Sequence, residues 1–535
     1  MGELKPVLAL YDFAGKQKYI YRTNRIKEII GGDGIIGDAF TDFMRELLGN
    51  GYCTEPTTKE LLQNGERILQ GKLKPFSVPQ FEQRAGECAD YFEIADIGGG
   101  NLWLLFNSEA SCLKANRCFS RQIIKNAYDL QLVCAYSESH LNGSYYEDTD
   151  AVLNRRADVR RELAWTVPAN VLPFTLVDRR TSMPVVCRRE ISGEERELSR
   201  DSEAKIEKYQ KFRNKLPNPR IDDQLDNMVS KKGKESLLAV LYIDGNGIGA
   251  TIKKLTDSLK NKTYEEAVNG YRLFSASIRE AFIEFPKNAI DDYVRCLGRN
   301  TEQSFVRWIV HAGDEVALIC NARLALDILR VYFDTVQKYN FEQKTDFTSC
   351  AGIAVFHSHD PFGAAYEMAE RCCKNAKELN RTFDGNHFVF DFQHGYGGTA
   401  NDFETIRLLQ ENDFTARPYV YGNAIKAWVR DEKPLGVPEK LYEHSFAHTF
   451  EKVVQNFNDS GIVRTDVKGL AEEIFTGQSY FEMELERLKS KLPVFDLDPS
   501  DRNAVYDVST VYDLWIFQEN VKYPGGKGAE ERNEN

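Results

Sequence analysis

The sequence predicts an α+β protein in which two copies of one β-α-α-β-β-α-β unit precede a helical C-terminal region. Three observations lead to this prediction. An apolar strand ends at an aspartate in each copy, a helix-compatible stretch follows it, and a hairpin and a further strand complete the unit. The strand, hairpin and last strand fall at residues 6–12, 91–106 and 130–136 in the first copy, and at 237–244, 306–320 and 348–356 in the second. Repetition of this order indicates a shared architecture.

The first strand of the second copy ends where a nucleotide could bind. Its apolar run delivers Asp244 at the tip. The residues that follow are Gly245, Asn246, Gly247, Ile248 and Gly249. Glycines let backbone amides approach a triphosphate without interference from Cβ atoms. We therefore expect a phosphate-binding turn directly after Asp244.

The hairpin of the second copy places two further carboxylates at its bend. The bend reads Ala312, Gly313, Asp314 and Glu315. Carboxylates from adjacent strand ends suit a pair of Mg²⁺ ions that clamp the attacking and leaving oxygens of a phosphoryl transfer. The alternative is that these are two ordinary acidic turns, because Asp-Gly is a common turn dipeptide.

The first copy differs at the same bend, where Gly98, Gly99, Gly100 and Asn101 replace the acidic residues. Asp12 still ends its first strand. Since the carboxylates that match Asp314 and Glu315 are missing, we expect this copy to hold no metal ions.

These features resemble the large, polymerase-like subunit of type III CRISPR–Cas effector complexes and, more distantly, the GGDEF diguanylate cyclases. The segments that carry the resemblance are residues 10–36, 244–246, 312–316, 350–380 and 416–420. The resemblance implies two ferredoxin-like palm domains, of which the second is catalytic. It also implies a fold in which the last of these segments begins a helical C-terminal domain.

The resemblance also implies roles for single residues. In the cyclases the metals take the positions that match Asp244, the carbonyl of Gly245, and Asp314. Glu315 would be a further ligand or would help deprotonate a ribose hydroxyl. The nucleotide would be bound by the backbone amides of Asn246, Gly247, Ile248 and Gly249, together with Gly313 of the hairpin. Lys377 would reach the β- and γ-phosphates, although Lys374 and Lys377 also fit a solvated helix face.

Two positions depart from the family pattern. Asn246 replaces the second acid of an Asp-x-Asp element, and Ala312 replaces the first glycine of the Gly-Gly pair. The replacement by Asn246 would weaken metal binding if a second carboxylate is needed at this position. The second departure leaves Gly313, Asp314 and Glu315 in place.

The implied reaction is attack of a ribose hydroxyl on the α-phosphorus of a nucleoside triphosphate with Mg²⁺ or Mn²⁺. In the CRISPR family the substrate is ATP and the product is cyclic oligoadenylate, a second messenger of antiviral defence. The partners would be other effector subunits with guide and target RNA. Two alternatives stay open: a non-catalytic scaffold subunit of such a complex, and a cyclic dinucleotide synthase that acts alone.

Composition limits other functions. The 535 residues carry a net charge of −12, which disfavours tight nucleic-acid binding by the chain alone. Arginine clusters at 155–161 and 179–189 are interleaved with acids and fit solvated helix faces. The eleven cysteines form no C-x-x-C pair, so no zinc site is predicted. His444 and His448 lack the glutamate of a zinc-binding helix.

We also expect no histidine-aspartate nuclease domain, because His359 and Asp360 have no further ligands suitably placed. A cytoplasmic protein is predicted, since no apolar run approaches the roughly 20 residues of a membrane span. The expected domains are a degenerate palm (1–150), a connector without a zinc site (151–232), a catalytic palm (233–398) and a helical domain (399–523). A disordered tail (524–535) follows.

Overall fold

The computed structural model describes most of the chain, in two compact units. The described residues are 4–23, 25–163, 174–191, 193–214, 225, 228–229, 236–297, 305–395, 403, 407, 414–422, 441 and 443–516. The first unit comprises Met1–Pro217, Ile248–Ile283 and Ala312–Asp314. The second comprises Asn218–Gly247, Glu284–His311 and Glu315–Asn535.

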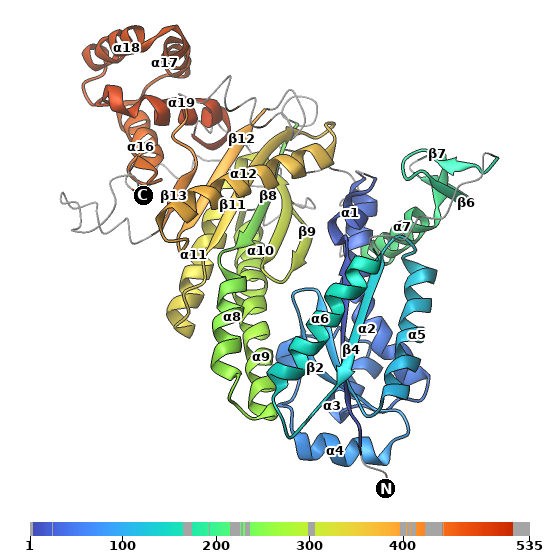
Figure 1. The fold of residues 1–535 in the computed structure, drawn as a ribbon. Coiled ribbons are helices and arrows are strands. Elements are labelled where there is room, and N and C mark those ends of the chain that lie inside the picture. The colour runs from blue at the N-terminus through green and yellow to red at the C-terminus, as the bar shows by residue number, and fades with distance from the viewer. Residues whose placement is uncertain are drawn as a thin grey trace. The chain divides into compact units, whose positions relative to one another are not determined.

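The first unit is built on a four-stranded sheet (Figure 1). Its strands are β1 (Val7–Ala14), β2 (Phe92–Gly98), β3 (Asn101–Phe106) and β4 (Gln131–Glu138). The order β2-β3-β1-β4 places β1 between two antiparallel neighbours. This is the order of a ferredoxin-like palm. The central strand is buried on both faces, which explains why its sequence is apolar almost throughout.

Helices cover both faces of this sheet. They are α1 (Lys16–Tyr21), α2 (Ile26–Gly49), α3 (Pro56–Gln63), η1 (Gln70–Lys72), α4 (Val78–Glu87), α5 (Glu109–Asn126) and α6 (Tyr145–Leu163). An aromatic cluster joins α2 and α5 to one face, where the rings of Phe43 and Phe119 stack 4.1 Å apart and Tyr11 meets both edge-on. Helix α6 packs on β4 and β1. Asp12 reaches α6 because it alternates with Tyr11 and Phe13.

The predicted connector contains regular structure of its own. A small sheet of β5 (Val177–Asp178), β6 (Met183–Ile191) and β7 (Glu194–Ser199) leads into α7 (Arg200–Arg213). Helix α7 crosses α2 closely, since a Cβ on Gly31 would lie 1.9 Å from the carbonyl oxygen of Lys205. Arg180 pairs with Glu28 at 2.7 Å. The connector is therefore packed onto the first unit.

Two helices from the sequence of the second copy also belong to the first unit. They are α8 (Ile248–Leu259) and α9 (Tyr264–Arg279). On α9, Arg272 donates to the carbonyl of Ala95 at 3.1 Å, beside a bulge in β2. Asn269 exchanges two hydrogen bonds with the backbone of Phe76. These two helices therefore pack in the first unit, although their sequence lies within the second copy. The domain limits predicted from composition stay predictions.

The second unit contains a six-stranded sheet (Figure 1). Its strands are β8 (Leu237–Gly245), β9 (Val306–Ala312), β10 (Glu315–Asn321), β11 (Ser349–His357), β12 (Phe388–His394) and β13 (Tyr419–Tyr421). The order is β13-β12-β11-β8-β10-β9. Strands β11, β8, β10 and β9 repeat the arrangement of the first sheet, and β12 and β13 extend it. Helices of this part are α10 (Phe285–Leu297), η4 (Ala322–Leu324), α11 (Ala325–Gln343) and α12 (Phe362–Phe383), whereas η3 (Glu280–Glu284) falls in the first unit up to Ile283.

The C-terminal region is helical, as predicted, but contributes one strand, β13, to the sheet. Its helices are α16 (Phe450–Ser460), α17 (Arg464–Thr476), α18 (Gln478–Lys491), η8 (Pro499–Asp501), α19 (Arg502–Val511) and η9 (Tyr512–Ile516). The predicted tail, 524–535, lies outside the described residues. The α+β class with two palm-type sheets is confirmed. No helix in the described ranges has both the length and the apolar character to cross a bilayer.

Candidate nucleotide and metal site

The first feature of the site is a pair of acidic residues that lie opposite each other on two adjacent strands. Glu315 opens β10 and stands directly opposite Asp244 of β8 in the antiparallel register. Opposed residues have Cβ atoms about 5 Å apart, so two carboxylates there repel each other unless a cation lies nearby. Both side chains contact α12, which shows that they occupy the same face of the sheet.

Helix α12 supplies the cation. The Nζ of Lys377 lies 2.6 Å from Oδ2 of Asp244 and donates to the carbonyl of Gly245 at 3.0 Å. These are two of the groups that the sequence assigned to a metal ion. The side chains of Lys377 and Asp244 keep exposures of 22% and 31%, so water and solutes can reach them. The ammonium therefore neutralises the site from a position that a divalent ion would also require.

The same helix face contributes two residues that the sequence analysis missed. The hydroxyl of Tyr366 donates to Oε1 of Glu315 at 3.3 Å. Burial raises the pKa of the half-buried Glu370, and the charge of Asp244 adds to the shift. Tyr366, Glu370 and Lys377 are spaced four and seven residues apart, which places them on one face of a helix. That spacing is a signal that sequence inspection could have used.

A glycine sets the distance between α12 and the sheet. A Cβ on Gly352 of β11 would lie only 1.9 Å from the carbonyl oxygen of Ala369 and 2.5 Å from the amide nitrogen of Cys373. Any larger residue would have to move the helix backbone. Cys372 and Cys373 are fully buried at this contact.

The turn after β8 contains a glycine in the left-handed conformation. Gly247 has φ +65°, a value that residues with a Cβ rarely adopt, and α8 begins at Ile248. Gly249 lies in the first turn of α8, where backbone amides can donate hydrogen bonds to a phosphate. In the first copy Gly15 stands at the same distance after Asp12, with φ +67°. The repeat therefore extends to backbone conformation.

The two hairpin bends differ in a way that bears on chemistry. In the first copy both loop residues, Gly99 and Gly100, have positive φ. In the second only Gly313 does, so the next loop position accepts a residue with a side chain, which is Asp314. Asp314 directly precedes Glu315, the residue paired with Asp244. The second bend can thus present two consecutive carboxylates.

The side chain of Asn246 hydrogen-bonds to residues outside the turn. Its Nδ2 donates to the hydroxyl of Thr348 at 3.0 Å and to the carbonyl of His387 at 2.9 Å. Its own amide donates to the carbonyl of Thr348 at 2.8 Å. A carboxylate has no proton to donate to the carbonyl of His387. Asn246 therefore holds the turn against β11 and the loop before β12, where the sequence suggested a weakened metal ligand.

Three cations surround the aspartate of the first copy, which also accepts a hydrogen bond from the amide of Phe13. Asp12 is 1% exposed and pairs with Lys16 at 3.1 Å and with Arg156 and Arg160 of α6. Burial alone would raise the pKa of Asp12, but Lys16 and Arg156 hold it below its ordinary value. Part of the predicted solvated arginine face is thus an ion-pair cluster. In both copies, a basic side chain on the helix after the fourth strand forms an ion pair with the aspartate of the first strand. The helix is α6 in the first copy and α12 in the second.

The donor set in the second copy fits a hard divalent ion. Carboxylate and carbonyl oxygens suit Mg²⁺, which is usually bound through one or two carboxylates together with substrate phosphates and water. Within the described ranges, no three His, Cys, Asp or Glu side chains are grouped at metal-binding spacing. A bound nucleotide would therefore have to complete the coordination. His444 and His448 contact backbone carbonyls and Ser445, respectively.

A family model matches the segment that contains these residues. Residues 237–382 match the family model of Cas10/Cmr2, second palm domain, so this segment is a Cas10-like palm. No curated protein matches the chain. The match covers β8 to α12, the elements that carry the site.

Solved structures give weaker similarity over a longer stretch. The apo Csm1–Csm4 cassette has a TM-score of 0.45 at 11% identity, covering 95% of this chain and 70% of that chain. The cassette in complex with pppApA gives 0.47 at 10% identity, covering 96% and 69%. The Csm1–Csm4 subcomplex in the type III-A CRISPR-Csm interference complex gives 0.41 at 12% identity, covering 94% and 70%.

The role of Asn246 can be tested by Asn246→Asp. The variant loses two donated hydrogen bonds and sets a carboxylate against the carbonyl of His387, so we expect a loss of about 1 to 3 kcal/mol in unfolding free energy. Mn²⁺ affinity, measured by titration, should not increase. Asn246→Ala, which removes the donors without adding charge, is the control. Tighter Mn²⁺ binding by Asn246→Asp would show that the position is a metal site.

Proposed function

We propose that the chain is a metal-dependent nucleotidyltransferase that joins ATP into cyclic oligoadenylate-type second messengers in a type III CRISPR-like antiviral system. One observation carries the proposal. Asp244 and Glu315 oppose each other beneath the helix that bears Lys377, within the segment that matches a Cas10 second palm. ATP as the substrate, and effector subunits with guide and target RNA as partners, are proposed on the basis of that family.

The reaction would join a ribose hydroxyl of one nucleotide to the α-phosphorus of another. The hydroxyl gives its proton to Glu315 or to water, the new P–O bond forms, and the bond to the departing pyrophosphate breaks. A bound Mg²⁺ or Mn²⁺ would supply charge neutralisation at the reacting phosphate. Asp244, Asp314, Glu315 and the carbonyl of Gly245 would hold the metal, and Tyr366 would orient Glu315.

The backbone would bind the triphosphate. The amides that follow Asn246 and the first turn of α8 present donors that suit phosphate oxygens. Gly247 permits the turn, and Asn246 holds it in place. Such preorganised donors can stabilise charge that develops on the phosphate without rearranging.

Lys377 would change partners during the cycle. In the structure its ammonium is bound to Asp244 and the carbonyl of Gly245, so it competes with a divalent ion for the same oxygens. A long, flexible lysine can move to a phosphate when metal and nucleotide enter together. Lys377 would then neutralise Asp244 in the free protein and bind a phosphate in the complex.

This exchange predicts opposite effects of Lys377→Ala on two ligands. Mn²⁺ affinity without nucleotide should rise about threefold, since the competing ion pair is partly exposed and worth less than about 1 kcal/mol. Binding of a triphosphate with metal should weaken about tenfold, because a charged hydrogen bond is lost. Lys374→Ala, an exposed lysine on the same helix, should change neither affinity. Parallel weakening of both ligands would contradict the exchange.

Product formation tests the function itself. The purified chain would be incubated with each nucleoside triphosphate and Mg²⁺ or Mn²⁺, and products would be identified by mass spectrometry. We expect a cyclic or linear oligonucleotide from ATP that is absent with Asp314→Ala. A product from GTP would instead favour the cyclic dinucleotide synthase. Absence of both product and metal-dependent nucleotide binding would favour the scaffold subunit.

A further inference from the structure

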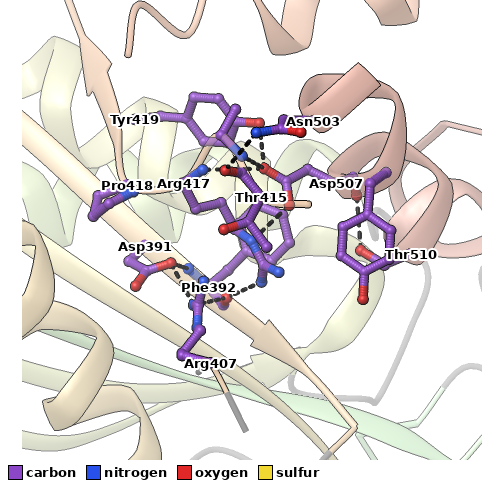
Figure 2. Close-up of polar contacts among 12 residues, drawn as sticks. Asp391, Phe392, Arg407, Thr415, Arg417, Pro418, Tyr419, Asn503, Asp507 and Thr510 are labelled. Atoms are coloured by element: carbon purple, nitrogen blue, oxygen red, sulfur yellow. Dashed lines mark hydrogen bonds and ion pairs between the residues drawn. The ribbon is translucent and has the colours of Figure 1, made fainter. Parts of the chain in front are cut away.

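A buried cluster of charges lies within the second unit, between the sheet and α19 (Figure 2). We call it the charge cluster; it consists of Asp391, Arg407, Arg417 and Asp507. Both aspartates are fully buried, and the side chains of Arg407 and Arg417 are 12% and 1% exposed. The site described above uses none of these residues.

One backbone carbonyl joins the two halves of the charge cluster. Arg407 donates to Oδ1 of Asp391 at 2.7 Å and to the carbonyl of Phe392 at 2.9 Å. Arg417 donates to the same carbonyl, and its Nε lies 2.8 Å from Oδ1 of Asp507. Figure 2 shows both arginines converging on Phe392. The contacts therefore run without a break from β12 to α19.

Asp507 fixes α19 to the segment that leads into β13. Its Oδ2 accepts hydrogen bonds from the amides of Ala416 and Arg417 at 2.9 and 3.1 Å. The hydroxyl of Tyr419 donates to the same oxygen at 2.6 Å. A carboxylate with this many donors has little freedom to move.

The other end of the charge cluster reaches the helix of the candidate site. Asn375 of α12 donates from Nδ2 to Oδ2 of Asp391 at 2.8 Å. Asn375 lies two residues before Lys377. The contact at Gly352 sets the height of α12 above the sheet, and Cys373 and Asn380 also contact Cys350 of β11. The directional bond from Asn375 ties the helix to β12 and so adds a constraint on its position along its axis.

Burying four charged groups is a costly way to stabilise a fold. Desolvation amounts to several kcal/mol for each ion, and apolar residues of similar size often give equal or greater stability. Such a network does specify one geometry, because each charge requires its partner in place. The charge cluster therefore indicates a need for a defined position of α12 relative to α19.

We propose that the charge cluster and Asn375 are positioning residues for Lys377, so that the placement of its ammonium on Asp244 depends on α19. A shift of α19 would act through Asp507, Arg417 and Asp391 on α12. The C-terminal helices would thereby control the cation of the site. The significance for catalysis rests on the proposed nucleotidyltransferase function, whereas the coupling itself does not.

The coupling can be measured by the reactivity of Lys377. A lysine released from an ion pair acylates faster, so the full chain would be treated with limiting acetic anhydride and modification of each lysine quantified by mass spectrometry. In Asn375→Leu and Asp507→Asn we expect labelling of Lys377 to rise about threefold or more, the size of a coupling between connected groups. Lys374, exposed on the same helix, serves as the internal reference.

A matched control removes a different aspartate at the start of the same C-terminal helix. Asp501→Asn breaks an ion pair with Lys452, at 2.8 Å, that does not involve the charge cluster. It should leave labelling of Lys377 unchanged. Circular dichroism and thermal melting would establish that each variant is folded. Tyr419→Phe, which removes one hydrogen bond to Asp507 of α19, takes the place of Asp507→Asn if that variant does not fold.

Two results would overturn the proposal. One is unchanged labelling of Lys377 in the folded cluster variants, and the other is an equal rise in Asp501→Asn. The assay contains neither nucleotide nor metal. A chain that makes no oligonucleotide therefore still gives a decisive result, which separates this inference from the proposed function.

Discussion

The close approach of α12 to β11 at Gly352 is the constraint on which the site depends. With no Cβ at this position, the helix backbone meets the strand directly. Lys377 can then reach Asp244 and the carbonyl of Gly245, while Tyr366 reaches Glu315. A helix held farther away by the extra bulk of a side chain would leave two opposed carboxylates without a cation. The glycine thus determines the electrostatics of the site as much as its shape.

The two copies neutralise the aspartate of the first strand with different numbers of basic side chains. Each ends its first strand at an aspartate that receives a cation from the helix after the fourth strand. In the first copy three cations surround a buried Asp12, and the hairpin bend carries no acid. In the second a single lysine meets a partly exposed Asp244 beside further carboxylates. The surplus negative charge of the second copy is the feature that suits metal and nucleotide.

Much of the fold could be predicted from the sequence because strand periodicity, the repeat and the turn glycines are local signals. The α+β class and the acidic hairpin were predicted on that basis. The role of Asn246 was not, because its partners Thr348 and His387 are distant in sequence. Arg156 and Arg160 were assigned to a solvated face for the same reason. The grouping of α8 and α9 with the first unit also depends on long-range contacts, such as that of Arg272 with β2.

The most direct test of the central claim is equilibrium binding of a non-hydrolysable ATP analogue with and without Mn²⁺, in the wild type and in Gly352→Ala. We expect binding that requires the metal and that weakens about tenfold or more in the folded variant, because displacement of α12 separates Lys377 from the site. Gly49→Ala, at a helix end with open space around it, is the control. Binding that ignores the metal, or that is unchanged in folded Gly352→Ala, would contradict the account.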